Sequence, residues 1–167
     1  RRSYCSTRPH GSIGDSRSIL GRSTNLDVER VTDPSELDRL GPDLIALYDQ
    51  VYGRASIVMG GLESRDFGRL ATELDRDFLL LTFREEGHLV GFQCGIHHAN
   101  SNSIEAYYVG FESEINKERA LYQRMLFEFI AWGTSLGASR VVMGRTALEI
   151  KSTLGAFPVE LYTYVHI

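Results

Sequence analysis

Three consecutive segments of strand-forming residues constrain the fold of this chain more than any other feature of its sequence. They cover residues 78–84, 89–98 and 104–111, the last of which is full of aromatic and β-branched side chains. Residues 85–88 contain a glycine that permits a positive φ, and residues 100–103 alternate asparagine and serine, so both stretches are typical of turns. The pattern predicts an antiparallel meander of three strands.

Helical patterns lie on both sides of this meander. Before it, a strand over residues 26–31 precedes two helices, one starting at the N-cap Asp33 and the other capped by Ser64. After it, apolar residues at helical spacing predict one long helix from about 116 to 136, which Gly137 ends. The apolar stripe of this long helix is wide, which indicates that the helix packs deeply.

The last part of the chain predicts a strand, a short helix and a closing strand. The first strand covers residues 140–143, Thr146 caps the helix, Gly155 closes it, and residues 159–165 alternate as the closing strand. A meander followed by strand, helix and strand on one sheet gives an α/β domain. We expect a mixed central sheet, partly antiparallel and partly parallel, flanked by helices.

Charge is distributed unevenly along the chain. Residues 1–24 are rich in Ser, Arg and Gly and carry five arginines against one aspartate, a charge of +4. The whole chain has a net charge of −4, so residues 25–167 carry −8. We therefore expect a basic extension over residues 1–24 and an acidic domain over residues 25–167. Such a domain is a poor general binder of nucleic acid.

Length and composition exclude several other classes of protein. The 167 residues are 43% hydrophobic and 24% charged, which suits one globular domain. Two cysteines are too few for a disulfide-built fold. No stretch of about 18 apolar residues occurs, and no apolar segment follows the basic start, so we expect a cytoplasmic protein without a membrane span.

The order of the predicted elements over residues 25–167 resembles the GNAT superfamily of N-acyltransferases. The segment from Gly144 to Ala156, GRTALEIKSTLGA, looks like the glycine–arginine…lysine…glycine signature of GNAT-like domains related to Fem-type peptidoglycan aminoacyltransferases. Residues 47–54 and 120–122 are also similar to that subgroup. Members of the subgroup often carry two such units in tandem, and this chain has room for one.

The resemblance implies where an acyl donor would bind. The strands at 104–111 and 140–143 would splay apart to admit it, and the long helix would aim its N-terminus at the donor's phosphates. Residues 112–118 depart from the family, because they contain no glycine and three carboxylates. Lys117 and Arg119 would have to offset these charges for acyl-coenzyme A to bind, so aminoacyl-tRNA stays open as a second donor.

Residues near the third strand of the meander are candidates for catalysis. N-acyl transfer requires an amine to lose a proton and a leaving group to gain one, which suits a carboxylate and a phenol. By alternation, Glu105 and Tyr107 share one face of this strand, and Tyr108 lies on the other with Ile104 and Ala106. The alternative is structural: sheet packing for the tyrosines and a solvated position for Glu105.

His97 is a second candidate for the base. It shares a strand face with Gly91, Gln93 and Gly95, where the glycines leave room for a ligand. His98 points to the opposite face and is expected to be a partly buried histidine with satisfied hydrogen bonds. The two histidines therefore form no metal pair, and no cysteine or carboxylate cluster completes a metal site, so no metal is expected.

Two further groups of residues are candidates for substrate binding. Arg145, Thr146 and Lys151 cluster around the start of the short helix, where they would bind a carboxylate or phosphate; a capped helix with a surface salt bridge is the alternative. Tyr52 and Arg54 end the helix that precedes Ser64, and in the family this helix borders the acceptor site. Core packing and a surface charge are the structural alternatives for these two.

The sequence thus predicts an N-acyltransferase that moves an acyl or aminoacyl group onto the amine of a small molecule or peptide. The alternative is a catalytically silent GNAT-like binding module, or half of a tandem enzyme. The edge of the closing strand, with Tyr162, Tyr164 and His166, would also allow a homodimer.

Overall fold

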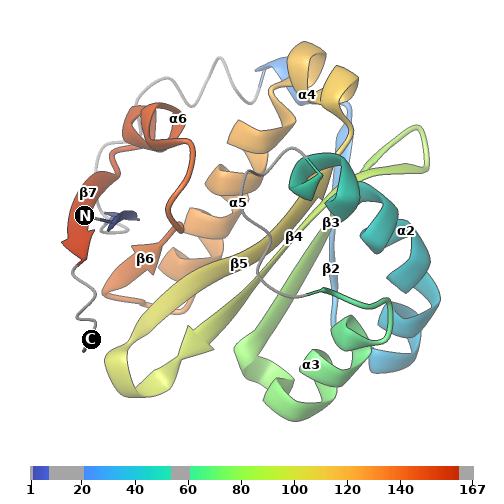
Figure 1. Ribbon diagram of the computed structural model, residues 1–167, viewed down its shortest axis with the longest axis horizontal. Coiled ribbons are helices and arrows are strands. Elements are labelled where there is room, and N and C mark those ends of the chain that lie inside the picture. The colour runs from blue at the N-terminus through green and yellow to red at the C-terminus, as the bar shows by residue number, and fades with distance from the viewer. Residues whose placement is uncertain (1, 8–20, 54–60, 162–167) are drawn as a thin grey trace, which may run out of the picture.

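The computed structural model describes residues 2–7, 21–53 and 61–161 (Figure 1). Within these ranges the strands form one seven-stranded sheet in the order β2-β3-β4-β5-β6-β1-β7. The strands in chain order are β1 (Arg2–Thr7), β2 (Leu26–Val31), β3 (Phe78–Glu85), β4 (His88–His98), β5 (Ser103–Phe111), β6 (Arg140–Val142) and β7 (Phe157–Leu161).

Helices cover both faces of this sheet (Figure 1). They are α2 (Pro34–Tyr52), α3 (Asp66–Leu74), α4 (Ser113–Arg119), α5 (Leu121–Ser135) and α6 (Leu148–Thr153), with short 3₁₀ turns at Asp75–Asp77 and Ala99–Ser101. The side chains of α5 pack into one hydrophobic core with β4, β5 and β6. Those of α2 and α3 form a second core on the other face. The predicted α/β class with a mixed, helix-flanked sheet is confirmed.

The predicted meander is confirmed. Strands β2 to β5 pair in succession, each antiparallel to the next. The turn between β3 and β4 places both Glu86 and Gly87 at positive φ, 52° and 83°, as a tight hairpin requires. Strand β6 then runs parallel to β5, so the sheet is mixed. The acidic side chain of Asp33 begins α2, since its Oδ1 accepts the backbone N–H of Ser35 at 2.7 Å.

Strand β1 lies between β6 and β7 and pairs antiparallel with both (Figure 1). Residues 2–7 of the predicted extension are therefore part of the sheet, and the domain boundary at residue 24 stays a prediction. The predicted strand–helix–strand unit is present, with β6 and β7 running in the same direction, but β1 separates the two strands. Strand β7 is the edge of the sheet, as predicted for the closing strand; Tyr162, Tyr164 and His166 lie outside the described residues.

The prediction of one long helix over 116–136 is wrong. Ala120 adopts a left-handed conformation, with φ 54°, and separates α4 from α5. The side chain of Asn116 stabilises this break, because its Oδ1 accepts the N–H of Tyr122 at 2.8 Å in the first turn of α5. Gly137, at φ 66°, follows the end of α5 as predicted.

The prediction that Ser64 caps the second helix is also wrong. Helix α3 begins at Asp66 after Arg65, with no side-chain cap. Asp66 instead folds back, and its Oδ2 accepts the N–H of Glu63 at 2.8 Å. The carboxylate of the first helical residue thus orders the preceding turn in place of a serine hydroxyl.

Candidate active site

A cleft opens where β5 and β6 part. The two strands are paired only from Ser103 with Arg140 to Glu105 with Val142, and beyond this point they diverge. The resulting cavity has a volume of about 980 Å³. It is lined from β5, from the C-terminal end of α2, from α5, and from the segment that follows β6. The splayed strands implied by the resemblance are therefore present.

A β-bulge in β5 places two tyrosines on the same side of the sheet. Gly95 of β4 pairs with Ala106, but Gln93 pairs with Val109, so two residues of β5 face a single residue of β4. Tyr107 and Tyr108 are those two residues, and their ring centroids lie 6.2 Å apart. The bulge breaks the strict alternation that the sequence suggested.

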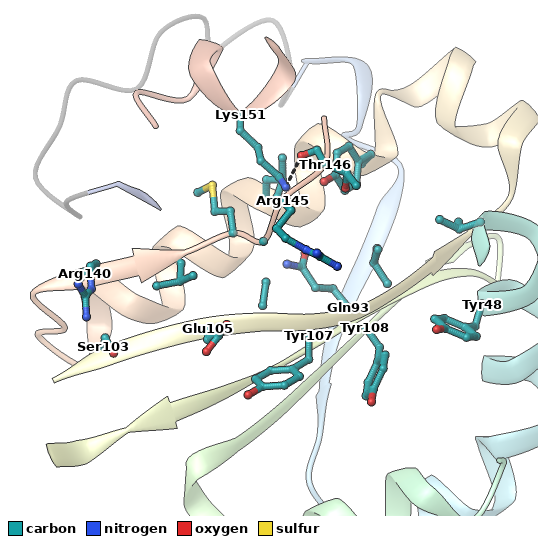
Figure 2. Close-up of a pocket in the computed structure, with 18 of the residues that line it drawn as sticks. Tyr48, Gln93, Ser103, Glu105, Tyr107, Tyr108, Arg140, Arg145, Thr146 and Lys151 are labelled. Carbon is teal, nitrogen blue, oxygen red and sulfur yellow. Dashed lines mark hydrogen bonds between the residues drawn. The ribbon is translucent and has the colours of Figure 1, made fainter. Parts of the chain in front are cut away.

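The predicted position of Tyr108 opposite Tyr107 is therefore wrong. Ile104 and Ala106 pack in the core beneath α5, whereas Tyr108 packs in the core beneath α2 and α3. Figure 2 shows both tyrosine side chains below β5, on the side away from Lys151. Two phenol groups consequently reach the same wall of the cleft.

This wall is extended by two tyrosines of α2. The rings of Tyr48 and Tyr52 stack with centroids 4.8 Å apart, and Tyr48 meets Tyr108 edge-on at 5.8 Å. Burial and the neighbouring Tyr52 raise the pKa of Tyr48 to about 12. Burial, followed by the charge of Glu105, also raises the pKa of Tyr107. These phenols keep their protons at neutral pH and can therefore donate hydrogen bonds.

Glu105 lies beside His98 in the polar end of the cleft. The carboxylate Oε2 and the imidazole Nε2 are 3.4 Å apart, and each side chain is 40% exposed. Ser101 and Ser103 line the same end, with their hydroxyl oxygens 2.7 Å apart. The sequence indicated Glu105 but treated His98 as a structural histidine. His98 and Glu105 lie close together because the hairpin brings the end of β4 beside the start of β5.

His97 lies apart from the cleft lining. Its Nδ1 is 3.0 Å from Oδ1 of Asp77, in the 3₁₀ turn before β3. The room predicted beside Gly91 and Gly95 is filled, because a side chain at either position would run into Met125 or Phe129 of α5. That expectation of space for a ligand is wrong, since the glycines allow the helix to approach the sheet.

Lys151 and Arg145 form the opposite wall of the cleft. Lys151 is only 1% exposed, and its ammonium donates a hydrogen bond to the backbone carbonyl of Thr146 (Figure 2). Arg145 is exposed and extends toward β5 in Figure 2. One cation is thus fixed by the fold and the other reaches into the cleft.

The predicted cap at Thr146 is wrong. The residue before α6 is Ala147, at φ 53°, and no side chain caps the helix. The left-handed turn at Ala147 takes the threonine out of the capping position. Thr146 lines the cleft, and its carbonyl is what holds Lys151.

The remaining predicted residues lie elsewhere. Lys117 pairs with Glu114 at 2.6 Å, and Arg119 donates from Nε to Oε1 of Glu85 at 2.7 Å; neither basic residue lines the cleft. The hydrogen bond that Arg119 donates to Glu85 raises the pKa of Arg119. Tyr52 is in the cleft, whereas Arg54 lies outside the described residues.

Sequence reasoning gave no role to Gln93. This residue is 2% exposed and lines the cleft, and its Oε1 has no hydrogen-bond partner among the described residues. The sequence signal that could have indicated a role for this residue is a glutamine in the middle of a strand predicted to be buried. Among the residues that the structure describes, no group of three or more His, Cys, Asp or Glu side chains is placed to hold a metal ion. No helix in this part of the chain is long and apolar enough to cross a bilayer.

No protein-family model and no curated protein sequence matches the chain. Solved structures do match it. An aminoglycoside acetyltransferase, meta-AAC0020 from an uncultured soil metagenomic sample, is 15% identical with a TM-score of 0.60, over 86% of this chain and 97% of that one. Glucosamine-6-phosphate N-acetyltransferase from Arabidopsis thaliana is 16% identical with a TM-score of 0.59, over 84% and 97%.

L-PGS from Bacillus licheniformis is 14% identical with a TM-score of 0.67; the match covers 94% of this chain but only 57% of that one. Identities this low establish the fold and nothing finer. The chain has the GNAT fold, as its element order led us to expect.

Proposed function

We propose that the protein is an N-acyltransferase, which moves an acyl or aminoacyl group from an activated donor to an amine. The cleft between β5 and β6 carries the proposal, because a carboxylate, several phenols and two cationic side chains line it together. The acetyltransferases that share the fold support it as an analogy.

The residues of the cleft suit direct transfer. Glu105 accepts a proton from the amine, either directly or through water, while the amine nitrogen attacks the donor's carbonyl carbon. The new C–N bond forms as the bond to the leaving sulfur or oxygen breaks, and Tyr107 or Tyr108 gives a proton to that atom. The proton taken up by Glu105 then restores the phenol through water. Arg145, with Lys151 behind it, holds an anionic part of donor or acceptor. Glu105 is preferred to His97 as the base because only Glu105 lines the cleft.

Acyl-coenzyme A and aminoacyl-tRNA are the two donors under this proposal. The similarity of residues 144–156 to Fem-type domains favours an aminoacyl donor. The acidic domain opposes tRNA binding through this part of the chain alone. Small amine or peptide acceptors suit either donor.

A silent binding module is the second candidate, and one observation favours it. Lys117 and Arg119, the two basic residues expected to offset the charge of a pyrophosphate, are both paired with carboxylates of this chain. A donor phosphate would have to displace these pairs or bind without them.

Thermal unfolding with acetyl-coenzyme A, a longer acyl-coenzyme A and, as control, adenosine 3′,5′-bisphosphate tests the proposal. A ligand at 100 times its Kd adds about 2.7 kcal/mol, which raises the midpoint by several degrees. Release of free thiol with a panel of amines then separates an enzyme from a binding module. A shift without thiol release supports the module, and no shift with any thioester excludes coenzyme A as the carrier.

A further inference from the structure

Gln93 lines the cleft and has a buried carboxamide oxygen without a hydrogen-bond partner among the described residues. Gln93 lies in the middle of β4, is 2% exposed, and lines the cleft. Its Oε1 finds no hydrogen-bond partner in the described part of the chain. Buried polar atoms are almost always paired in folded proteins, so an exception beside a cavity indicates a partner that arrives with a ligand.

Gln93 has apolar neighbours on β4 and α5. Its neighbours on the same side of β4, Gly91 and Gly95, face Met125 and Phe129 of α5. Leu126 of α5 lines the cleft as well. A leucine would pack here without leaving an acceptor unpaired. The described part of the fold therefore gives no structural reason for a carboxamide at this position.

Gln93 also lies next to the bulge of β5, with its side chain on the face of the sheet opposite Tyr107 and Tyr108. It pairs with Val109 at the bulge that turns Tyr107 and Tyr108 into the cleft wall. In Figure 2 the side chain lies between β5 and Arg145, which reaches down from the opposite wall. A ligand that bridges the two walls would pass the carboxamide.

We propose that Gln93 binds the acyl donor, with its carboxamide oxygen accepting a hydrogen bond from an N–H or O–H group of that donor. The inference rests on the proposed acyltransferase function and sharpens it, because the donor must then carry such a group where it passes the α5 side of β4. Two parts of a thioester provide one: an amide N–H of the pantetheine arm, or a hydroxyl or amino substituent on the acyl chain.

Binding of two matched thioesters tests the proposal. The dissociation constants of butyryl-coenzyme A and 3-hydroxybutyryl-coenzyme A are measured by calorimetry for the wild type, for Gln93→Leu, and for Gln50→Leu. Gln50 is exposed on α2 and does not line the cleft, so it is the control for loss of a carboxamide. Removing the acceptor leaves a ligand donor unpaired, so we expect Gln93→Leu to weaken binding by about tenfold to a hundredfold.

The pattern of weakening identifies the donor group. Equal weakening of both thioesters assigns the hydrogen bond to the pantetheine amide. Weakening of the hydroxylated thioester alone assigns it to the acyl substituent. If Gln93→Leu binds both thioesters as tightly as the wild type does, this inference is overturned and the proposed function stays intact. Neither thioester bound by the wild type overturns the inference together with the coenzyme A donor.

Thermal unfolding separates ligand binding from a structural role. Because Oε1 has no partner in the described fold, Gln93→Leu should unfold at the wild-type temperature or above it. A fall of several degrees for Gln93→Leu, absent for Gln50→Leu, would show that the carboxamide supports the fold and would overturn the inference.

Discussion

The two walls of the cleft are built in different ways. The wall of Glu105, Tyr107 and Tyr108 belongs to β5, a nine-residue strand paired with β4 along most of its length. The wall of Arg145 and Lys151 follows β6, a strand of three residues, and includes the six-residue helix α6. The first wall is positioned by the sheet, whereas the second depends on a few side-chain contacts. Chemistry that needs exact proton positions is expected on the first wall, and adaptable binding of charge on the second.

Glu105→Gln tests the catalytic role of the β5 wall and should have the largest effect. Loss of a positioned general base lowers the rate by about 10²–10⁴-fold. The measurement is kcat for thiol release with whichever amine the panel identifies. Glu29→Gln, on the exposed surface of β2, is the control and should keep wild-type activity. A Glu105→Gln enzyme within threefold of wild type would remove the carboxylate from the mechanism.

Lys151→Ala and Arg145→Ala separate the two cations of the opposite wall. Lys151 is buried and bonded to the carbonyl of Thr146, so its removal leaves a cavity and an unpaired acceptor. We expect a loss of about 2–4 kcal/mol in the free energy of unfolding, and a fall in Tm of about 5–15 °C.

Arg145 is exposed, and its removal should change stability by less than about 0.5 kcal/mol while weakening the binding of an anionic ligand. Thermal and urea unfolding of the two variants side by side provide the comparison. Equal stability losses would contradict the division between a structural and a ligand-binding cation.

Gly95→Ala tests how tightly the β5 wall is supported from behind. The added methyl group would meet the ring of Phe129 and, at 2.7 Å, the backbone oxygen of Glu105. We expect a loss of about 1–3 kcal/mol in the free energy of unfolding, measured in urea. Gly61→Ala, where nothing lies within 4 Å, is the matched control and should be near neutral. If both substitutions prove neutral, α5 is free to move away from the sheet.

Alkaline pH should lower the free energy of unfolding through Tyr48 in the aromatic part of the β5 wall. We expect this effect to be the smallest of those predicted. The pKa of Tyr48 is raised to about 12 in the folded protein from an ordinary value of 10.0. A raised pKa means that the folded state binds this proton more tightly than the unfolded state. The contribution is complete below pH 10 and is lost as the pH rises toward 12. Urea midpoints between pH 8 and 11 should fall less for Tyr48→Phe than for the wild type; parallel curves would show that the ring titrates as in the unfolded chain.

Local patterns were sufficient to predict most of the fold. The meander followed from strand-forming runs and from turns such as that at Gly87, and α2 from the cap at Asp33, because these signals act within a few residues. The break at Ala120 was missed because it depends on the side chain of Asn116 folding across to Tyr122. The position of β1 was missed because its partners lie at the other end of the chain.

The residues of the candidate site were predicted where local residue patterns were sufficient, and missed where tertiary packing decides. Glu105, Tyr107, Tyr108, Arg145 and Lys151 all line the cleft, as their residue types and the family resemblance suggested. The facing of Tyr108 was mistaken, since alternation along a strand cannot reveal a bulge. Gln93 and the proximity of His98 to Glu105 depend on tertiary packing, which periodicity does not encode.

Because of strand β1, the two walls of the cleft can form at different times during synthesis of the chain. Ser6 pairs with Val142 and Tyr4 with Val159, so β1 is synthesised well before its partners β6 and β7 and can join the sheet only after they have been made. The β2–β5 meander joins neighbours in sequence and is free to form while the rest of the chain is still being made. The cationic side of the cleft is therefore completed after the β5 wall, when β1 pairs with β6 and β7.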